Sequence, residues 1–277
     1  MMGAMVLAAV VQISSQTDLA DNLARCRRLV ASAAARGAQL VVLPENFALM
    51  GEESERLRIA ERVDDAAPGP IVGALQEAAR AADVFVVGGG FPERSEDAAR
   101  PYNTSVVVAP DGSIVARYRK IHLFDVEVGD GVSYRESSAT TSGREPVVAD
   151  VHVLRVGLTI CYDVRFPELY RALVDRGAQV LTVPAAFTLA TGKDHWHVLL
   201  RARAIESQSY VLAAAQWGSH PRGRRTYGKS CIIDPWGDVL AQAPEGEGFA
   251  VAELDPARVS AVRRDLPSLE HRVLGRG

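Results

Sequence analysis

Cys161 has the sequence surroundings of a reactive thiol. It follows the apolar run 156–160, which predicts a strand, and a helix is predicted to begin near Pro167. Backbone N–H groups and the positive end of a helix dipole lower a cysteine pKa from about 8.5 toward neutrality, which would raise the thiolate fraction. The other thiols, Cys26 and Cys231, fall on an apolar helix face and in a strand, so we expect them in the core.

A nucleophilic thiol needs a base and a group that stabilises negative charge. Glu45 directly follows the predicted strand 39–43 and Pro44, and Lys120 follows the predicted strand 114–118. Because α/β folds place sites at the carboxyl ends of strands, these side chains are candidates to meet Cys161. By spacing alone, however, Cys161 is more typical of a structural cysteine, and Glu45 and Lys120 of solvated surface charges.

Three stretches of the chain recur in the same order and predict an internal duplication. The paired stretches are 37–44 (Gly-Ala-Gln-Leu-Val-Val-Leu-Pro) with 177–184 (Gly-Ala-Gln-Val-Leu-Thr-Val-Pro), 83–88 with 210–215, and the hairpin 106–116 with the hairpin 231–241. The alternative is chance similarity between ordinary strand and turn sequences.

Short apolar strands, beginning with 5–11, alternate with helical stretches such as 18–35, a pattern typical of an α/β fold. Two similar halves, each with one apolar sheet face to cover, would pack sheet on sheet with helices outside. We therefore predict a four-layer α-β-β-α sandwich of two pseudo-symmetric halves. We expect one domain over residues 1–277, with 127–150 as the connection between the halves.

Composition narrows the class of protein. The 277 residues are 48% hydrophobic, enough to bury a sizeable core, and 31 basic against 34 acidic residues leave a net charge of −3. This balance argues against a nucleic-acid partner. Three cysteines without a C-x-x-C pair favour reduced thiols in a cytoplasmic protein. The apolar run 4–11 is too short for a membrane span, so we expect no membrane association.

Two other features predict neither a cofactor nor a metal. Gly88–Gly90 follows a predicted strand but lacks the spacing of a dinucleotide-binding loop. His195 and His197 are two residues apart on a predicted helix and therefore face different sides, which disfavours a shared metal ion. A serine hydrolase is also disfavoured, because no G-x-S-x-G motif occurs.

Three segments resemble the signatures of the nitrilase, or carbon–nitrogen hydrolase, superfamily. They are 43–47 (Leu-Pro-Glu-Asn-Phe), 118–125 (Tyr-Arg-Lys-Ile-His-Leu-Phe-Asp) and 157–169 (Gly-Leu-Thr-Ile-Cys-Tyr-Asp-Val-Arg-Phe-Pro-Glu-Leu). The resemblance runs nearly end to end and implies the same sandwich fold. It also implies that Glu45 is the general base, Lys120 the oxyanion stabiliser and Cys161 the nucleophile. Glu136 is similar to the second glutamate that many members place beside the lysine.

The last third of the chain resembles one branch of that superfamily, the deaminated glutathione amidases. The segments that carry this resemblance are 185–192, 194–206, 208–217 and 227–230. It implies a cysteine-dependent amidase that hydrolyses a small anionic amide through a thioester. An omega-amidase acting on α-ketoglutaramate or succinamate is the alternative within the superfamily. A non-catalytic protein of the same fold is the alternative of another class.

An anionic substrate suggests where to look for its binding residues. Arg165, four residues after the nucleophile, is the candidate to bind a carboxylate, with Phe187 and Thr191 lining the pocket. A salt bridge at the helix entry is the alternative for Arg165. The backbone N–H of Tyr162 would share the oxyanion with Lys120. The resemblance also implies a homodimer formed through helices that include 196–206.

Overall fold

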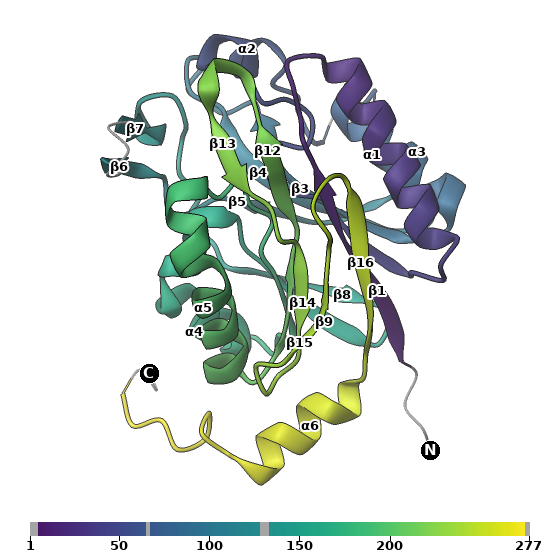
Figure 1. The fold of residues 1–277 in the computed structure, drawn as a ribbon, viewed down its shortest axis with the longest axis vertical. Helices are drawn as coiled ribbons and strands as arrows, with labels where there is room; N and C mark the ends of the chain where they lie inside the picture. The colour runs from purple at the N-terminus through teal and green to yellow at the C-terminus, as the bar shows by residue number, and fades with distance from the viewer. Residues whose placement is uncertain (1–4, 65–66, 128–132, 275–277) are drawn as a thin grey trace.

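Strand β1 (Val6–Ile13) lies at the centre of the larger of two main sheets and is buried along nearly its whole length. The structure is a computed structural model that describes residues 5–64, 67–127 and 133–274 (Figure 1). The β1 side chains alternate, because successive residues of a strand point to opposite faces. Ala8 and Val10 face the second sheet, whereas Ala9 and Val11 face the helices on the outside.

The larger sheet has eight strands in the order β13-β12-β1-β2-β3-β4-β5, with β16 also paired to β1. Strands β1, β2 and β3 are parallel, and β4 and β5 extend the sheet as an antiparallel hairpin. The bounds are β2 (Leu40–Val42), β3 (Phe85–Glu93), β4 (Tyr102–Val108), β5 (Ile114–Arg119), β12 (Ala215–Ser219), β13 (Arg225–Tyr227) and β16 (Gly248–Leu254).

The second main sheet has six strands in the order β15-β14-β11-β10-β9-β8. Its bounds are β8 (Val147–Val151), β9 (Leu154–Leu158), β10 (Val180–Thr182), β11 (Tyr210–Ala213), β14 (Cys231–Ile233) and β15 (Val239–Gln242). Strands β9, β10 and β11 are parallel, and β14 and β15 follow as an antiparallel hairpin. A separate small hairpin joins β6 (Asp125–Glu127) to β7 (Ser133–Arg135).

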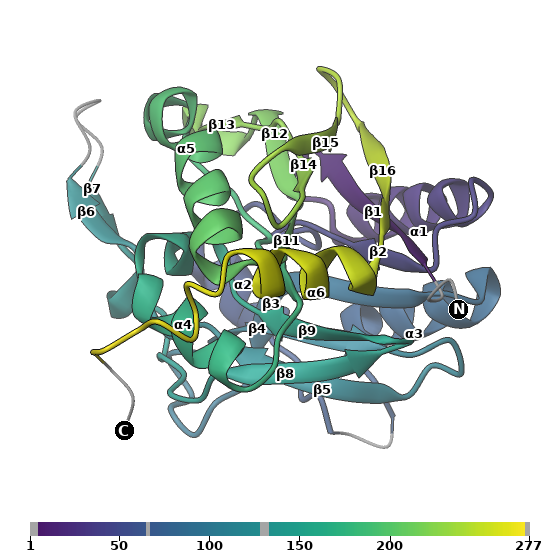
Figure 2. The same cartoon turned by 90° about the horizontal axis from the view of Figure 1, so that it is seen from below.

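The helices lie on the outer faces of the two sheets, which gives the predicted four layers (Figures 1 and 2). Helices α1 (Leu19–Ala34) and α3 (Pro70–Ala82) cover the larger sheet, and α4 (Pro167–Asp175) and α5 (Leu189–Ser207) cover the second. The remaining helices are α2 (Glu53–Arg58), α6 (Pro256–Asp265) and the short 3-10 helices η1 (Glu136–Ser138), η2 (Cys161–Arg165) and η3 (Pro221–Gly223). The α-β-β-α sandwich is therefore confirmed.

The two sheets repeat the same plan, as the sequence duplication predicts. Each sheet contains one antiparallel strand, then three parallel strands, then an antiparallel hairpin. In the larger sheet this order is β16-β1-β2-β3-β4-β5, and in the second it is β8-β9-β10-β11-β14-β15. The matched segments occupy equivalent places: β2 and β10, β3 and β11, and the two hairpins. The halves are nevertheless interleaved, because β12, β13 and β16 come late in the chain and join the larger sheet.

Several boundaries differ from those expected from sequence. The connection 127–150 is not a plain linker: its described part contains β7, η1 and most of β8, whose Ala149 and Val151 pack in the core. The first helix is shorter by one residue at each end. Asp18 is its N-cap and accepts a hydrogen bond from the Asp21 backbone, and Ala35 is its C-cap. The first strand extends to Ile13, since its last residues pair with β12.

Leu40 provides a test of the contact between the sheets. Its side chain is fully buried in the core cluster that includes residues of both sheets, so Leu40→Ala leaves a cavity there. We expect this change to lower the free energy of unfolding by about 2–5 kcal/mol, measured by urea denaturation. The matched control Leu266→Ala, at a half-exposed side chain, should change it by less than about 0.5 kcal/mol. Equal effects would contradict the proposed role of Leu40 in this core.

Candidate active site

The three predicted reactive side chains lie at strand ends and line one cavity of about 290 Å³. Glu45 follows β2, Lys120 follows β5 and Cys161 follows β9. The other residues selected from sequence line the same cavity: Glu136, Tyr162, Arg165, Phe187 and Thr191. The structure therefore brings together all eight predicted residues, and their individual roles remain predictions.

Lys120 lies between two carboxylates that also line this cavity. Its Nζ is 3.0 Å from Glu45 Oε1 and 2.9 Å from Glu136 Oε2. Glu45 and Lys120 are only 4% and 2% exposed, so neither is the solvated surface charge that spacing alone suggests. Two further donors hold Glu45: Asn103 Nδ2 at 2.9 Å from Oε1, and the Ala186 backbone N–H at 3.1 Å from Oε2.

These contacts fix the charges of Glu45 and Lys120. Burial alone would raise the pKa of the Glu45 carboxyl, but the adjacent Lys120 ammonium, with hydrogen bonds to Lys120 and Cys161, holds that pKa below its usual range. Burial would lower the pKa of Lys120, but the Glu136 and Glu45 carboxylates raise it above its usual value. Glu45 is therefore ionised and Lys120 protonated at neutral pH.

The Cys161 thiol is not activated as predicted from sequence. Burial and the Glu45 carboxylate raise the pKa of Cys161 well above its ordinary value, although Lys120 acts in the opposite direction. A helix dipole does little here, because Cys161 begins the short helix η2 and α4 begins only at Pro167. The resting thiol is thus protonated, next to a carboxylate able to accept its proton.

Cys161 adopts an unusual backbone conformation. Its φ of +48° is in the left-handed region, which costs a non-glycine residue about 1–3 kcal/mol and occurs often at functional sites. Its N–H donates to the Pro184 carbonyl at 2.8 Å, which fixes the residue at the end of β10. Cys26 and Cys231 are buried as expected, and burial raises the pKa of each thiol to about 12.

Asp163 holds the turn that carries the nucleophile, a role not predicted from sequence. Its fully buried carboxylate accepts hydrogen bonds from the Ile160 backbone at 2.8 Å and from Tyr118 Oη at 2.7 Å. It also accepts one from the His122 backbone at 3.1 Å and lies 2.7 Å from His122 Nδ1. Asp163 therefore joins the segment around Cys161 to the segment around Lys120, and its place two residues after Cys161 was the available signal.

Two of the three consecutive glycines of β3, Gly89 and Gly90, lie against the segment that carries Glu45. A Cβ on Gly89 would lie 2.0 Å from the Leu43 carbonyl oxygen, so only glycine fits this close backbone approach. The Gly90 carbonyl accepts a hydrogen bond from the Asn46 N–H at 2.8 Å, next to the general-base candidate. This glycine run, which carries no phosphate-binding pattern, thus positions a catalytic candidate.

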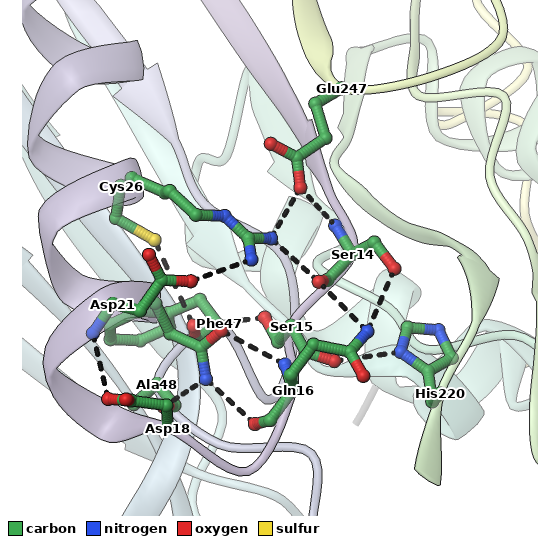
Figure 3. A network of polar contacts seen from close by, with 12 residues as sticks. Ser14, Ser15, Gln16, Asp18, Asp21, Cys26, Phe47, Ala48, His220 and Glu247 are labelled. Atoms are coloured by element: carbon green, nitrogen blue, oxygen red, sulfur yellow. Dashed lines mark hydrogen bonds and ion pairs between the residues drawn. The ribbon is translucent and has the colours of Figure 1, made fainter.

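A network of hydrogen bonds also holds the segment that follows Glu45 (Figure 3). Ser15 Oγ donates to the Phe47 carbonyl at 3.0 Å, and His220 Nδ1 lies 2.9 Å from the Ser15 carbonyl. Gln216 Nε2 donates to both Ser15 Oγ and the Glu45 carbonyl, at 2.9 and 3.0 Å. The network therefore ties the segment after β2 to β1 and β12.

The wall beside the nucleophile is aromatic and cationic. The Arg165 guanidinium lies 5.2 Å from the Phe187 ring centroid, and both its terminal nitrogens are 3.4 Å from His195 Nδ1. No carboxylate of a described residue pairs with Arg165, so the alternative of a helix-entry salt bridge does not hold among those residues. Arg56 and Arg224 also line the cavity, and sequence reasoning missed both.

Comparison with known proteins identifies the family. The family profile described as carbon-nitrogen hydrolase matches residues 7–264. The chain belongs to the carbon-nitrogen hydrolase family. A protein of Synechocystis named deaminated glutathione amidase is 49% identical over 270 residues, covering 96% of this chain and 98% of that protein.

Two solved structures of relatives agree with this family. Nit3 of Saccharomyces cerevisiae, described as a member of branch 10 of the nitrilase superfamily, has a TM-score of 0.87 at 32% identity over 96% of both chains. A variant of the Nesterenkonia sp. AN1 amidase has a TM-score of 0.77 at 27% identity over 95% of this chain and 98% of that one. It is described as showing Michael addition of acrylamide at its active-site cysteine. This carbon-nitrogen hydrolase is an amidase, acting on carbon–nitrogen bonds other than peptide bonds.

Glu45→Gln tests the electrostatics of this amidase site. Removing the carboxylate removes a charge that raises the Cys161 pKa, so the pKa should fall and the thiolate fraction at neutral pH should rise. We expect iodoacetamide to alkylate Cys161 faster in this variant, with the rate profile shifted to lower pH, as followed by mass spectrometry. The control Glu53→Gln removes an exposed carboxylate from the same cavity and should leave the rate unchanged. A rate profile that keeps the wild-type pH dependence in the Glu45 variant would contradict the proposed effect of the Glu45 charge on the Cys161 pKa.

Proposed function

We propose that this amidase hydrolyses the amide bond of deaminated glutathione through a thioester on Cys161. The observation that carries the proposal is the buried Glu45–Lys120 ion pair in the cavity that also holds the thiol. The name of the Synechocystis relative supports the substrate, and the adduct on the active-site cysteine of the Nesterenkonia amidase supports the nucleophile. The same arrangement argues against a non-catalytic protein.

In the first half of the reaction, ionised Glu45 takes the proton of the Cys161 thiol while the sulfur attacks the amide carbonyl carbon. The carbonyl oxygen becomes an oxyanion, which Lys120 Nζ and the Tyr162 backbone N–H stabilise. Glu45 then passes its proton to the amide nitrogen, the C–N bond breaks, and the amine leaves. The acyl group remains on the sulfur as a thioester.

In the second half, Glu45 takes a proton from water, and the resulting hydroxide attacks the thioester carbonyl. The same two donors stabilise the second oxyanion, the C–S bond breaks, and Glu45 returns its proton to the sulfur. Glu136 keeps the ammonium in place, because its carboxylate contacts Lys120 Nζ and also accepts a hydrogen bond from the Phe124 backbone at 2.7 Å. The net reaction consumes one water and releases one acid and one amine.

Arg165 is our candidate to bind the acyl side of the substrate. It lies on η2, four residues after Cys161, and is flanked by the Phe187 and Tyr162 rings. The acyl group of deaminated glutathione carries an α-keto carboxylate, and a guanidinium can bind it through two hydrogen bonds. Thr191 lines the same cavity and presents a hydroxyl.

Replacing Cys161 by Ala or Ser tests the nucleophile. We expect kcat/KM for deaminated glutathione to fall at least about a thousandfold in either variant, because neither side chain can form the thioester. Release of α-ketoglutarate is the measurement, and the control Cys231→Ala should keep its activity. Mass spectrometry of the wild-type protein, quenched during turnover of a slow amide, should show an acyl adduct on Cys161.

Substrate preference separates the two candidate amidases. A higher kcat/KM for deaminated glutathione than for α-ketoglutaramate or succinamate supports the proposed substrate. The opposite preference would identify an omega-amidase, with the mechanism on Cys161 unchanged. Full activity of the Cys161 variants would overturn the mechanism itself.

The interleaved strands of the two sheets support a single carbon-nitrogen hydrolase domain over residues 1–277. All three cysteines are free, which supports a reducing, cytoplasmic location. No helix among the described residues is long and apolar enough to cross a membrane. We further propose a homodimer formed through α5 and the adjacent β14–β15 turn.

Exposed apolar side chains support that interface. Val198 and Ile205 of α5 are 67% and 47% exposed, and Trp236 in the β14–β15 turn is 52% exposed. The two elements are in contact, because Arg201 Nε donates to the Gly237 carbonyl at 2.7 Å. Exposed apolar side chains gathered on neighbouring elements favour an interaction surface there.

Val198→Glu should therefore dissociate the homodimer, since it would bury a charge in the interface. The molar mass measured by light scattering after gel filtration should fall from that of two chains to that of one. Val153→Glu, at a comparably exposed valine between β8 and β9, is the matched control and should remain dimeric. An unchanged mass of the Val198 variant would exclude this surface as the interface.

A further inference from the structure

Arg56 is a buried cation that the proposed mechanism does not use. Its side chain lines the active-site cavity from α2 and is only 9% exposed. Its Nε and Nη2 are buried without a hydrogen-bond partner, and no described carboxylate forms an ion pair with it. A buried guanidinium without a partner is costly by several kcal/mol, so its position requires an explanation.

Arg224 is a second cation on this part of the wall. It follows η3 and lines the same cavity, and its buried Nε also lacks a partner. Its positive charge contributes to the low pKa of the Glu45 carboxyl, so its field reaches the reaction centre. The elements that carry the two arginines are in contact, because Arg222 Nη2 lies 3.3 Å from Glu52 Oε1. Arg56 and Arg224 thus enter the cavity from adjoining segments.

The arginine pair and Arg165 reach the cavity from different elements of the fold. Arg165 extends from η2, the element that carries Cys161, whereas Arg56 and Arg224 extend from α2 and the β12–β13 loop. Arg224 also lines a neighbouring cavity of about 1080 Å³, which shares Tyr134 and Thr188 with the active-site cavity. Arg224 therefore lines both cavities, and Arg56 lines the active-site cavity beside it.

The charge of the cavity fits an anion with two carboxylates. Its described lining has five cationic side chains and three carboxylates, an excess of two positive charges. Lys120 is already paired with Glu45 and Glu136, so the excess resides on the arginines. Deaminated glutathione has one carboxylate on the acyl side of the scissile amide and another on the glycine of the leaving amine.

We propose that Arg56 and Arg224 bind the carboxylate of the leaving amine, and so determine the preference for a leaving amine that carries this carboxylate. This inference rests on the proposed function. Hydrolysis of the scissile amide of deaminated glutathione releases α-ketoglutarate from the acyl side and cysteinylglycine as the amine. Arg165 binds the carboxylate of the acyl side beside Cys161. Arg56 and Arg224 bind the glycine carboxylate until the amine leaves.

The test compares two substrates that differ only in this carboxylate: deaminated glutathione and its counterpart with a C-terminal glycinamide. Wild-type enzyme should prefer the carboxylate substrate, and Arg56→Gln should remove most of that preference. We expect kcat/KM of the variant to fall about tenfold to a hundredfold for deaminated glutathione, mainly through KM, and to change less than about twofold for the glycinamide. Release of α-ketoglutarate reports both reactions.

Three variants serve as controls. Arg58→Gln removes an exposed arginine of the same helix and should leave both substrates unaffected. Arg165→Gln removes an acyl-side contact and should lower kcat/KM for both substrates by a similar factor. Arg56→Lys keeps the charge without the two parallel donors, and should retain part of the preference. Activity of Arg56→Gln on the glycinamide also shows that this variant is folded.

The outcomes are distinct. If Arg56→Gln lowers the rates of both substrates equally, or of neither, the inference is wrong while the proposed function stands. If wild-type enzyme cleaves the glycinamide as well as the carboxylate substrate, no site for that carboxylate operates, and the inference is again wrong. If wild-type enzyme cleaves neither substrate, the proposed function fails and the inference fails with it.

Discussion

The buried ion pair of Glu45 and Lys120 is the interaction on which the rest of the site depends. Removing two charges from water costs several kcal/mol per ion, and close contact offsets this only with good geometry and further hydrogen bonds. The structure provides them: Asn103 and Ala186 donate to Glu45, and Glu136 contacts Lys120. Because these partners come from different strands and loops, both sheets must pack correctly before the charges are satisfied.

The internal repeat explains how one site receives groups from both halves of the chain. The duplicated segment ends in the same way in both halves, with Pro44–Glu45 after β2 and Pro184–Ala185 after β10. Glu45 forms an isolated parallel β-bridge with Gly90, and Ala185 forms the equivalent one with Ala215. At the first end the side chain supplies the carboxylate. At the second, the backbone N–H of the next residue, Ala186, donates to that carboxylate. The equivalent ends have thus taken complementary roles.

Much of this arrangement can be predicted from sequence, because strand ends and duplicated segments leave local patterns. The two hairpins, the order of the repeats, and the places of Glu45, Lys120 and Cys161 at strand ends follow from such patterns. Their selection as one reactive group comes from the family resemblance, because spacing alone favours structural or surface roles. The protonation of Cys161 does not, since burial and the Glu45 charge arise only when distant strands pack. Arg56 was missed for the same reason: nothing in the sequence around α2 shows that one of its arginines is buried.

A protonated Cys161 thiol in the resting enzyme is compatible with the proposed chemistry, because the negative charge that the reaction needs already lies on Glu45. Before attack, Lys120 faces the charge on Glu45. As Glu45 takes the thiol proton, that charge passes through the sulfur to the carbonyl oxygen, which the same ammonium stabilises. The buried site therefore holds one negative charge that moves between neighbouring atoms, rather than creating a new ion in a medium of low dielectric. A fixed thiolate would add a second anion beside Glu45, and the raised pKa of Cys161 prevents this.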